Sequence, residues 1–296
     1  MMIVSFFGGL ASQMDQYAFY QALKFHYPDV SIKMDIFNLF PIEHNGFELD
    51  TVFNIERNEC RWIDVVTLAD IFPLKKRYFL PRYLNKVRQI FLGVKESWIT
   101  PDDPTAFYKD VFELNPLRPY LFFGNWSHEN YKKGIEARLR SDFKFKEELT
   151  GFNLDFAQKI QESESVSIHV RRGDYKKCNF PMLDLNYYKA AVDIISHNVN
   201  NPLFFIFSDD IEYVRSHFSF LSNYVIIQGN CREKSYIDMQ LMSLCRHNII
   251  ANSGFSYWGA WLNTNPQKIV IAPKNHVKWC KYPIACHDWT LIDNCI

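Results

Sequence analysis

Residues 167–175 of this chain read Ser-Ile-His-Val-Arg-Arg-Gly-Asp-Tyr. Apolar and polar side chains alternate from Val166 up to the paired arginines Arg171 and Arg172, as they do along a strand with two different faces. The alternation then stops, which predicts a strand that ends in a loop at the carboxyl edge of a sheet. Two guanidinium groups at such an edge form a charged clamp that suits phosphate oxygens, and Asp174 can orient an arginine or accept a proton. A surface ion pair that follows a core strand is the alternative interpretation.

Strands and helices alternate on both sides of this segment. The chain opens with an expected strand over residues 3–7, a Gly8-Gly9 turn, a helix over 13–25 and a strand over 30–34. The later pattern predicts strands over 166–171, 203–207, 224–227, 249–251 and 269–272, and helices over 184–196, 236–245 and 257–262. Such a series predicts an α/β fold with a doubly wound parallel sheet, which binds ligands at the carboxyl ends of its strands. At 296 residues the chain is long enough for two domains, which we place at residues 1–155 and 156–296.

The composition predicts a folded protein without a global charge. Hydrophobic residues make up 48% of the chain, and 33 basic side chains balance 33 acidic ones. This balance argues against nucleic acid as a partner, so an anionic ligand has to be met by local charges. The seven cysteines include no CxxC pair, and the N-terminus lacks the pattern of a secretion signal, so we expect a cytoplasmic protein. The cysteines and histidines near the C-terminus match no standard zinc spacing, so no metal site is expected.

Residues 72–95 combine basic and aromatic side chains without an acidic residue. Such a segment can lie on an anionic membrane surface or contact a charged lipid carrier, which predicts peripheral contact at the inner face of the inner membrane. A solvated helix face whose aromatic side chains pack inward is the alternative. No stretch of the chain reaches the apolar length of a membrane span.

Three strand ends in the second domain carry polar residues that belong on one edge. Besides the arginine segment, these are Ser208-Asp209-Asp210 and Asn252-Ser253-Gly254-Phe255-Ser256. Serine hydroxyls and N–H groups at a helix N-terminus bind phosphate, while a carboxylate suits the N1–H and amino group of a guanine. Helix capping is the plain alternative for Asp209, Ser253 and Ser256. Because the three ends converge, a nucleotide diphosphate site is the stronger interpretation.

The run from His169 to Tyr175 resembles the arginine motif of the α-1,2-fucosyltransferases of glycosyltransferase family 11. Four further segments resemble motifs of that family, in the family's order, and together they span nearly the whole chain. They are residues 8–18 (Gly-Gly-Leu-Ala-Ser-Gln-Met-Asp-Gln-Tyr-Ala), 44–49 (His-Asn-Gly-Phe-Glu-Leu), 207–210 (Phe-Ser-Asp-Asp) and 249–262 (Ile-Ile-Ala-Asn-Ser-Gly-Phe-Ser-Tyr-Trp-Gly-Ala-Trp-Leu).

The resemblance implies a GT-B fold, in which two Rossmann-like domains face a cleft. It also implies an inverting, metal-independent transfer of L-fucose from GDP-fucose to the 2-hydroxyl of a β-galactoside. The acceptor would be a galactose-terminated bacterial surface glycan of the O-antigen type, free or linked to a lipid. No cofactor is implied, because GDP-fucose is the donor substrate.

The resemblance further implies roles for individual residues. Arg171 would hold the β-phosphate with support from Arg172, while His169 and Asp209 would lie near the guanine or the ribose. The rest of the implied donor site is Gly9, Asn252, Ser253, Phe255 and Ser256, with the serines near the diphosphate. On the acceptor side it points to Gln13, His44 and Glu48.

Two segments depart from the family pattern. Ala11, Ser12 and Asp15 stand where the family usually has Gly, Asn and Phe. Gly254 and Tyr257 stand where Ser and Trp are usual. The intact arginine motif predicts that donor binding is retained, whereas the altered first loop bears on the acceptor or the linkage.

Departure of GDP requires stabilisation of developing negative charge, which Arg171 can supply directly. The adjacent Asp209-Asp210 pair lacks the spacing of a metal-binding DxD motif. The attacking hydroxyl needs a general base, for which Asp174 is the first candidate, although orienting Arg172 suits it equally well. Glu48 and Asp15 are weaker candidates. Two other functions stay open: a catalytically silent protein that binds a sugar nucleotide or glycan, and a nucleic-acid binder that uses residues 75–95.

Overall fold

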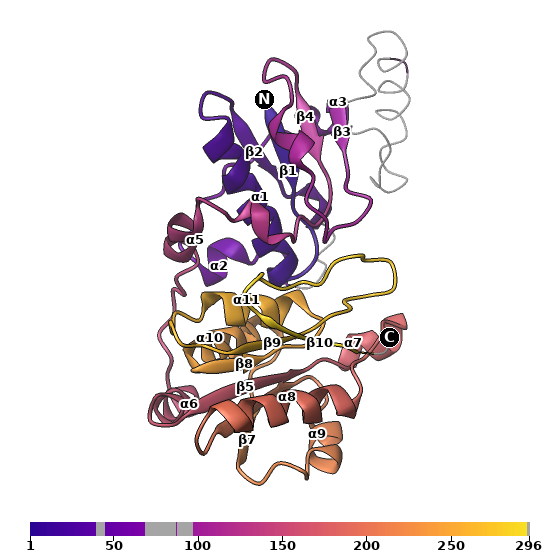
Figure 1. Cartoon of the computed structure of the whole chain (residues 1–296). Helices are drawn as coiled ribbons and strands as arrows, with labels where there is room; N and C mark the ends of the chain where they lie inside the picture. Colours follow the sequence, from indigo (N-terminus) through magenta and orange to yellow (C-terminus); the bar gives the residue numbers. More distant parts are fainter. Residues whose placement is uncertain (40–44, 69–86, 88–96, 295–296) are drawn as a thin grey trace. The chain divides into compact units, whose positions relative to one another are not determined.

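The computed structural model describes residues 1–39, 45–68, 87 and 97–294 (Figure 1). The chain divides into two compact units, residues 1–146 and 147–296. The boundary expected after residue 155 lies within helix α6 (Phe152–Gln161), which belongs wholly to the second unit.

The first unit is built on a four-stranded parallel sheet with the order β2-β1-β4-β3. Its strands are β1 (Met2–Ser5), β2 (Ile32–Asp35), β3 (Trp98–Ile99) and β4 (Tyr120–Phe122). Its helices are α1 (Leu10–His26), α2 (Leu49–Val52), α3 (Trp62–Leu68) and α5 (Glu136–Asp142), with 3₁₀ turns η1 (Phe37–Leu39), η4 (Lys109–Phe112) and η5 (Glu129–Tyr131). The predicted strand–turn–helix–strand start is confirmed, and positive φ at Gly8 (74°) allows the turn between β1 and α1.

The second unit holds a six-stranded parallel sheet with the order β10-β9-β8-β5-β6-β7. The strands are β5 (Ser165–Val170), β6 (Leu203–Ser208), β7 (Tyr224–Ile227), β8 (His247–Ile249), β9 (Val270–Pro273) and β10 (Thr290–Ile292). Besides α6, the helices are α7 (Gly173–Cys178), α8 (Leu185–Asn198), α9 (Ile211–His217), α10 (Tyr236–Leu244) and α11 (Gly254–Leu262), with the 3₁₀ turn η6 (Arg232–Lys234). The five predicted strands are confirmed to within a residue or two, whereas β10 was not predicted.

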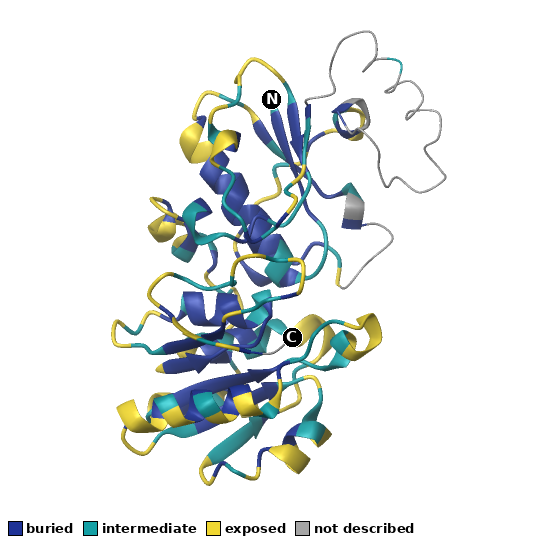
Figure 2. Ribbon diagram, turned by 45° about the vertical axis from the view of Figure 1, so that its right-hand side comes forward, coloured by how far each residue is buried: buried dark blue, intermediate teal, exposed yellow. Residues whose placement is uncertain are grey.

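Helices cover both faces of this sheet, as a doubly wound fold requires. On one face Ile168 and Ile206 pack with residues of α8 and α9 such as Ile195 and Val214. On the other face the sheet packs with residues of α6 and α10, among them Ile160. Figure 2 shows the central strands of the sheet as buried, while the helices turn exposed faces outward. The predicted doubly wound parallel sheet is therefore confirmed.

Both faces of β5 are buried, including the face that carries its polar residues. Ser167 and His169 are 2% and 5% exposed. Ser167 Oγ accepts a hydrogen bond from Asn248 Nδ2 at 2.8 Å, and Asn248 Oδ1 accepts one from Asn263. The alternation in the sequence thus separates an apolar interior face from a polar interior face, on which Ser167 is satisfied by Asn248.

Candidate active site

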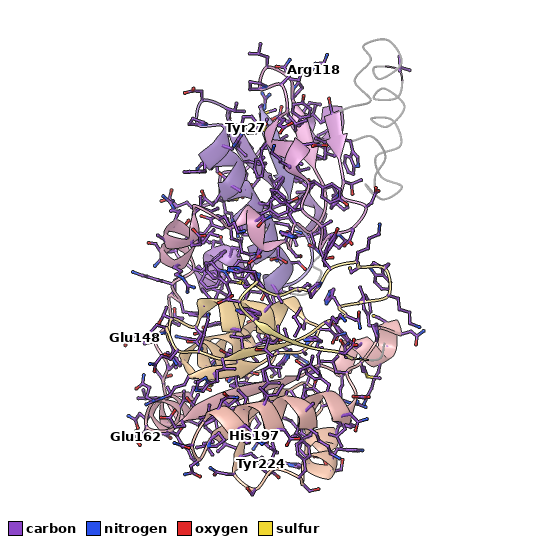
Figure 3. The ribbon with its side chains drawn as sticks, viewed as in Figure 1. Tyr27, Arg118, Glu148, Glu162, His197 and Tyr224 are labelled. Atoms are coloured by element: carbon purple, nitrogen blue, oxygen red, sulfur yellow. The ribbon has the colours of Figure 1, made fainter. Side chains whose placement is uncertain are left out.

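The strand order of the second sheet reverses between β5 and β8. From β5 the chain proceeds outward through β6 and β7, then returns to β8 on the other side and continues to β9 and β10. Ligands of doubly wound sheets bind at such a switch point, beside the carboxyl ends of the two central strands. Arg171 and Arg172 follow β5 at this edge, and Asn252 and Ser253 follow β8. In Figure 1 this end of β5 leads into α7, whereas Glu162, labelled in Figure 3, lies at the opposite end of the strand.

The Arg171 guanidinium lies between two carboxylates. Its Nη2 donates to Asp174 Oδ2 at 2.7 Å, and its Nη1 lies 3.1 Å from Asp209 Oδ2. The side chain is 29% exposed, and its Nε is buried without a hydrogen-bond partner among the described residues. Phosphate oxygens can exchange with carboxylate oxygens on such a fork because their charge and geometry are alike. Asp174, which was considered for orienting Arg172, is instead paired with Arg171.

Arg172 is held by a carboxylate and an aromatic ring. Its Nε donates to Asp210 Oδ2 at 3.2 Å, and its guanidinium carbon lies 3.4 Å from the centre of the Tyr213 ring. Asp210 also caps α9 by accepting from the N–H of Tyr213, and it accepts a further hydrogen bond from Lys176. The Lys176 hydrogen bond is the main reason that the pKa of Asp210 lies below its usual value. These contacts suit the supporting role that was predicted for Arg172.

Asp209 ties the arginine loop to the end of β6. Its Oδ1 accepts hydrogen bonds from the backbone N–H groups of Arg172 at 2.8 Å and Gly173 at 2.9 Å. A Cβ added at Gly173 would stand 3.0 Å from the Asp209 carboxyl carbon, so the close approach of this loop depends on glycine. These contacts make Asp209 a positioning residue, and its predicted contact with guanine or ribose stays a prediction.

His169 lies one residue before the end of β5, against α11. Burial, followed by the positive charge of Arg171, lowers the pKa of His169 to about 3, so the imidazole is neutral at physiological pH. Its ring centre lies 5.8 Å from that of Phe255, and its Nδ1 is buried without a hydrogen-bond partner in the described part of the chain. A neutral imidazole beside an aromatic ring can exchange hydrogen bonds with a base or a ribose hydroxyl.

The N-terminus of α11 has serines that already make hydrogen bonds. Ser253 Oγ caps the helix by accepting from Phe255 N–H at 3.3 Å. Ser256 is 1% exposed; its Oγ accepts from Ala251 N–H at 3.1 Å and donates to the Ser253 carbonyl at 3.3 Å. A phosphate at this helix start would therefore contact backbone N–H groups and Ser253, because the Ser256 hydroxyl already has hydrogen-bond partners. The predicted phosphate role of Ser256 stays a prediction.

Asn252 connects two loops at the carboxyl edge. Its Nδ2 donates to the carbonyl groups of Pro181 at 2.8 Å and His276 at 3.0 Å, and its own carbonyl accepts from the Tyr175 hydroxyl at 2.8 Å. Its Oδ1 is buried and has no hydrogen-bond partner among the residues described. The switch point thus gathers three such atoms, from His169, Arg171 and Asn252, where buried polar groups are nearly always paired.

Gly9 and Gln13 belong to the first loop of the first unit. Gly9 is the N-cap of α1. Gln13 is fully buried; its Nε2 donates to the carbonyl groups of Gly8 and Gly46 at 3.0 and 2.8 Å, and its Oε1 accepts from Glu48 N–H at 2.9 Å. Gln13 therefore joins two loops of the unit through its whole amide group.

The other residues that were predicted on the acceptor side are less informative. The Glu48 carboxylate is 6% exposed and accepts a hydrogen bond from Asn45 at 2.9 Å. His44 lies outside the described residues, as does the segment 72–95 apart from Val87. In the described part of the chain, no helix has the length and apolar character needed to cross a membrane.

Asp15, one of the departures from the family pattern, is buried beside a buried lysine. Its Oδ2 accepts from Ser127 Oγ at 2.8 Å, and its Oδ1 lies 3.9 Å from Lys132 Nζ. Lys132 is 2% exposed and donates to the Ser127 carbonyl at 3.0 Å. The lysine compensates the carboxylate that stands where an aromatic side chain is usual, which explains how the fold accommodates the change.

The sequence analysis did not identify Asp238, in the first turn of α10. Burial raises its pKa to about 6, and its Oδ1 accepts from Asn230 Nδ2 at 2.8 Å. Asn230 and Asn153 exchange a pair of amide hydrogen bonds beside a pocket of 260 Å³, which is also lined by Glu148, labelled in Figure 3. An acidic residue inside an otherwise apolar helical run was the available sequence signal. Because Asp238 hydrogen-bonds with Asn230, which lines this pocket, its perturbed carboxyl group is a candidate for ligand recognition.

Within the described residues, no three His, Cys, Asp or Glu side chains gather in a way that could hold a metal ion. The cations at the switch point are Arg171, Arg172 and Lys176, and they pair there with the carboxylates of Asp174, Asp209 and Asp210.

A doubly wound sheet with a guanidinium fork at its switch point is typical of proteins that bind phosphorylated ligands. The family described as Glycosyl transferase family 11 matches residues 103–291. An α-1,2-colitosyltransferase of Escherichia coli is 32% identical over 90% of this chain and 89% of its own length. The O-antigen biosynthesis glycosyltransferase WbnK of Escherichia coli is 29% identical over 92% of each chain. This chain therefore belongs to glycosyltransferase family 11.

Comparison with solved structures gives partial matches. A mutant of Arabidopsis thaliana FUT1 in complex with GDP has 12% identity and a TM-score of 0.48, over 91% of this chain and 69% of its own. The fucosyltransferase NodZ from Bradyrhizobium has 13% identity and a TM-score of 0.47, over 87% of this chain and 91% of its own. The predicted α/β class is confirmed, with a parallel sheet in each of two units, as a protein of the GT-B type has.

Proposed function

We propose that this protein transfers L-fucose from GDP-fucose to the 2-hydroxyl of a β-galactoside in a bacterial surface glycan. The observation that carries the proposal is the set of three buried polar atoms without described partners, Arg171 Nε, His169 Nδ1 and Asn252 Oδ1, at the switch point. Donors and an acceptor of these kinds suit a nucleoside diphosphate held by its phosphates and its base or ribose. The names of the two Escherichia coli relatives support a deoxysugar as the transferred group and an O-antigen as the product.

The reaction breaks the bond between the fucose anomeric carbon and the β-phosphate oxygen, so negative charge develops on the departing GDP. Arg171 faces this charge, and the phosphate oxygens would take the place of Asp209 on its fork while Asp174 stays paired with Arg171. Arg172 and the N-terminal N–H groups of α11 add fixed positive potential. The acceptor oxygen attacks in line from the opposite face of the sugar, which inverts the configuration, and its proton passes to a base.

Asp174 is suited to position Arg171 during this step. Its Oδ2 is occupied by the guanidinium at 2.7 Å, so the hydroxyl proton would have to compete for the same carboxylate. We therefore propose that Asp174 orients the fork, and that a separate group accepts the proton. The two weaker candidates for the base, Glu48 and Asp15, are buried and accept hydrogen bonds from Asn45 and Ser127.

A second candidate donor is GDP-colitose, because the relative that is 32% identical is an α-1,2-colitosyltransferase. Colitose lacks the 3-hydroxyl of L-fucose, so the two donors differ in one hydrogen-bonding group. Incubation of the protein with each donor and a series of β-galactosides, with the product linkage assigned by NMR, tests the proposal. We expect an α-1,2-fucosyl product in the presence of excess EDTA. Binding of GDP without transfer or hydrolysis of either donor would instead favour the catalytically silent protein.

A further inference from the structure

An aromatic row leads away from the arginine fork in the second unit. The Arg171 guanidinium lies 5.7 Å from the centre of the Tyr175 ring, which lies 5.3 Å from that of Phe180. The Phe180 ring in turn lies 5.4 Å from that of Trp279, at an interplanar angle of 67°. We call Tyr175, Phe180 and Trp279 the aromatic row. It connects the centre of the proposed reaction site to the surface in three steps.

The far end of the row presents a large aromatic surface to solvent. Trp279 is 60% exposed, and Tyr282, three residues later in the same loop, is 50% exposed. Exposed aromatic surface that is continuous with a polar site is typical of a ligand-binding surface. Phe180 is half-buried between Tyr175 and Trp279, so the row has a supported base and an open end.

Hydrogen bonds fix the row in place. The Tyr175 hydroxyl donates to the Asn252 carbonyl, and burial raises its pKa to about 12, so it keeps its proton. Phe180 N–H donates to the Tyr175 carbonyl at 3.0 Å. The Asn252 amide bonds to Pro181 and His276 connect the loop that carries Phe180 to the loop that carries Trp279. Preorganised aromatic rings bind a ligand without a further cost of ordering.

The loop that carries Trp279 is closed at its base. It connects β9 to β10. Asn275 donates from its backbone N–H to Asn294 Oδ1 and from its Nδ2 to the Asn294 carbonyl, both at 2.8 Å. Asn294 Nδ2 in turn donates to the Asn275 carbonyl at 3.1 Å. Ordered loops of this length with their ends close together are frequently functional.

We infer that the aromatic row is a subsite for the acceptor glycan, and that Trp279 stacks on the pyranose ring next to the one that receives the transferred sugar. One face of a pyranose ring presents C–H groups, which suit the electron-rich face of an indole. The continuity of the row with Arg171 favours this occupant over an anionic lipid surface, although Lys278 and Lys281 flank Trp279. The inference rests on the proposed function and specifies its acceptor as longer than a single sugar.

The experiment compares lactose, which has two rings, with methyl β-galactoside, which has one. We expect Trp279→Ala to lower kcat/KM for lactose about three- to tenfold through KM, with a smaller loss for methyl β-galactoside and an unchanged KM for GDP-fucose. Trp279→Phe should retain most of the activity because a phenyl ring can still stack. The matched control is Phe25→Ala, which removes an aromatic side chain that is 68% exposed in the first unit and should change neither constant.

An unchanged lactose KM in Trp279→Ala, or an equal loss with both acceptors, would overturn the inference. If Trp279→Ala no longer sediments with vesicles that contain anionic lipid, while its KM for lactose is unchanged, the inference is overturned in favour of a membrane contact. Saturation-transfer NMR of lactose provides a readout that does not need turnover. If the wild type binds lactose through Trp279 but transfers no sugar, the proposed function is refuted and the subsite is supported. If the protein transfers sugar and Trp279→Ala binds lactose as the wild type does, only the subsite is refuted.

Discussion

The first loop of the first unit and the arginine loop of the second unit use their polar side chains in opposite ways. In the first loop Gln13 is fully buried, and its amide group hydrogen-bonds with three backbone groups. In the second unit the Arg171 side chain is 29% exposed and is held by carboxylates that an anion can replace. Both loops contain segments that resemble family motifs. The structure assigns the first loop to the scaffold, and we propose that the arginine loop binds the ligand.

The charged residues of the two loops show the same contrast between scaffold and site. Asp15 and Lys132 neutralise one another inside the first unit, 6% and 2% exposed in their side chains. The charges around Arg171 remain at the sheet edge, where three buried polar atoms have no partner among the described residues. Substitutions in the first loop should therefore affect stability, and substitutions in the arginine loop should affect chemistry.

The largest effect is expected for Arg171→Ala. Removing a group that stabilises charge in the transition state costs about 10²–10³ in kcat, and loss of a phosphate contact weakens GDP binding as well. Steady-state transfer from GDP-fucose and calorimetric titration of GDP measure the two effects. The control is Arg246→Ala, which breaks the Arg246–Glu164 ion pair at the other end of the strands and should leave both constants unchanged. Turnover of Arg171→Ala within about threefold of wild type would remove the guanidinium fork from the mechanism.

Lys132→Met should lower the free energy of unfolding by about 3–5 kcal/mol, because it leaves the buried Asp15 carboxylate without its cation. Urea unfolding followed by circular dichroism measures this loss. The double variant Asp15→Leu/Lys132→Met removes both charges and should recover most of the stability. A double variant as unstable as the single one would show that the pair is not the cause.

Asp174→Asn separates two roles in the arginine loop. An amide can still accept a hydrogen bond from Arg171, so a positioning role predicts a loss in kcat of at most about tenfold. Loss of a general base would cost about 10²–10⁴ and would remove a limb of the pH profile of kcat. A comparison of the pH profiles of kcat for the wild type and for Asp174→Asn decides between these outcomes.

The smallest effect is expected for Asp238→Asn. The pKa of about 6 in the folded protein exceeds the ordinary value of 3.8, so the neutral carboxyl group favours the folded state and this contribution is lost as pH rises through 6. Asparagine should therefore stabilise the protein by about 1–2 kcal/mol at pH 7, with no difference near pH 3.5. Melting temperatures across this pH range measure the change. A difference in melting temperature between the wild type and Asp238→Asn that does not vary with pH would refute the raised pKa of Asp238.

Much of the fold could be predicted because the strands of the second unit are apolar runs that end in polar residues. Leu203–Ser208 and Tyr224–Ile227 are examples of this pattern. The strand β10 (Thr290–Ile292) escaped prediction because three residues at a sheet edge, largely exposed, carry no clear period.

Within the site, the sequence identified the residues at the strand ends and not their partners. The pairing of Arg171 with Asp209 and the pairing of Asp15 with Lys132 depend on contacts between residues far apart in the chain. Trp279 was missed because a single aromatic residue in a long loop resembles any other exposed side chain until its neighbours Phe180 and Tyr175 are known.

The central claim is that the arginine loop of the second unit, and not the first loop of the first unit, holds the diphosphate. A crystal structure of the protein with bound GDP tests it directly. We expect the β-phosphate within hydrogen-bond distance of the Arg171 guanidinium, with Asp209 displaced from that fork. A diphosphate bound instead at residues 8–13, with the Arg171 ion pairs intact, would contradict it.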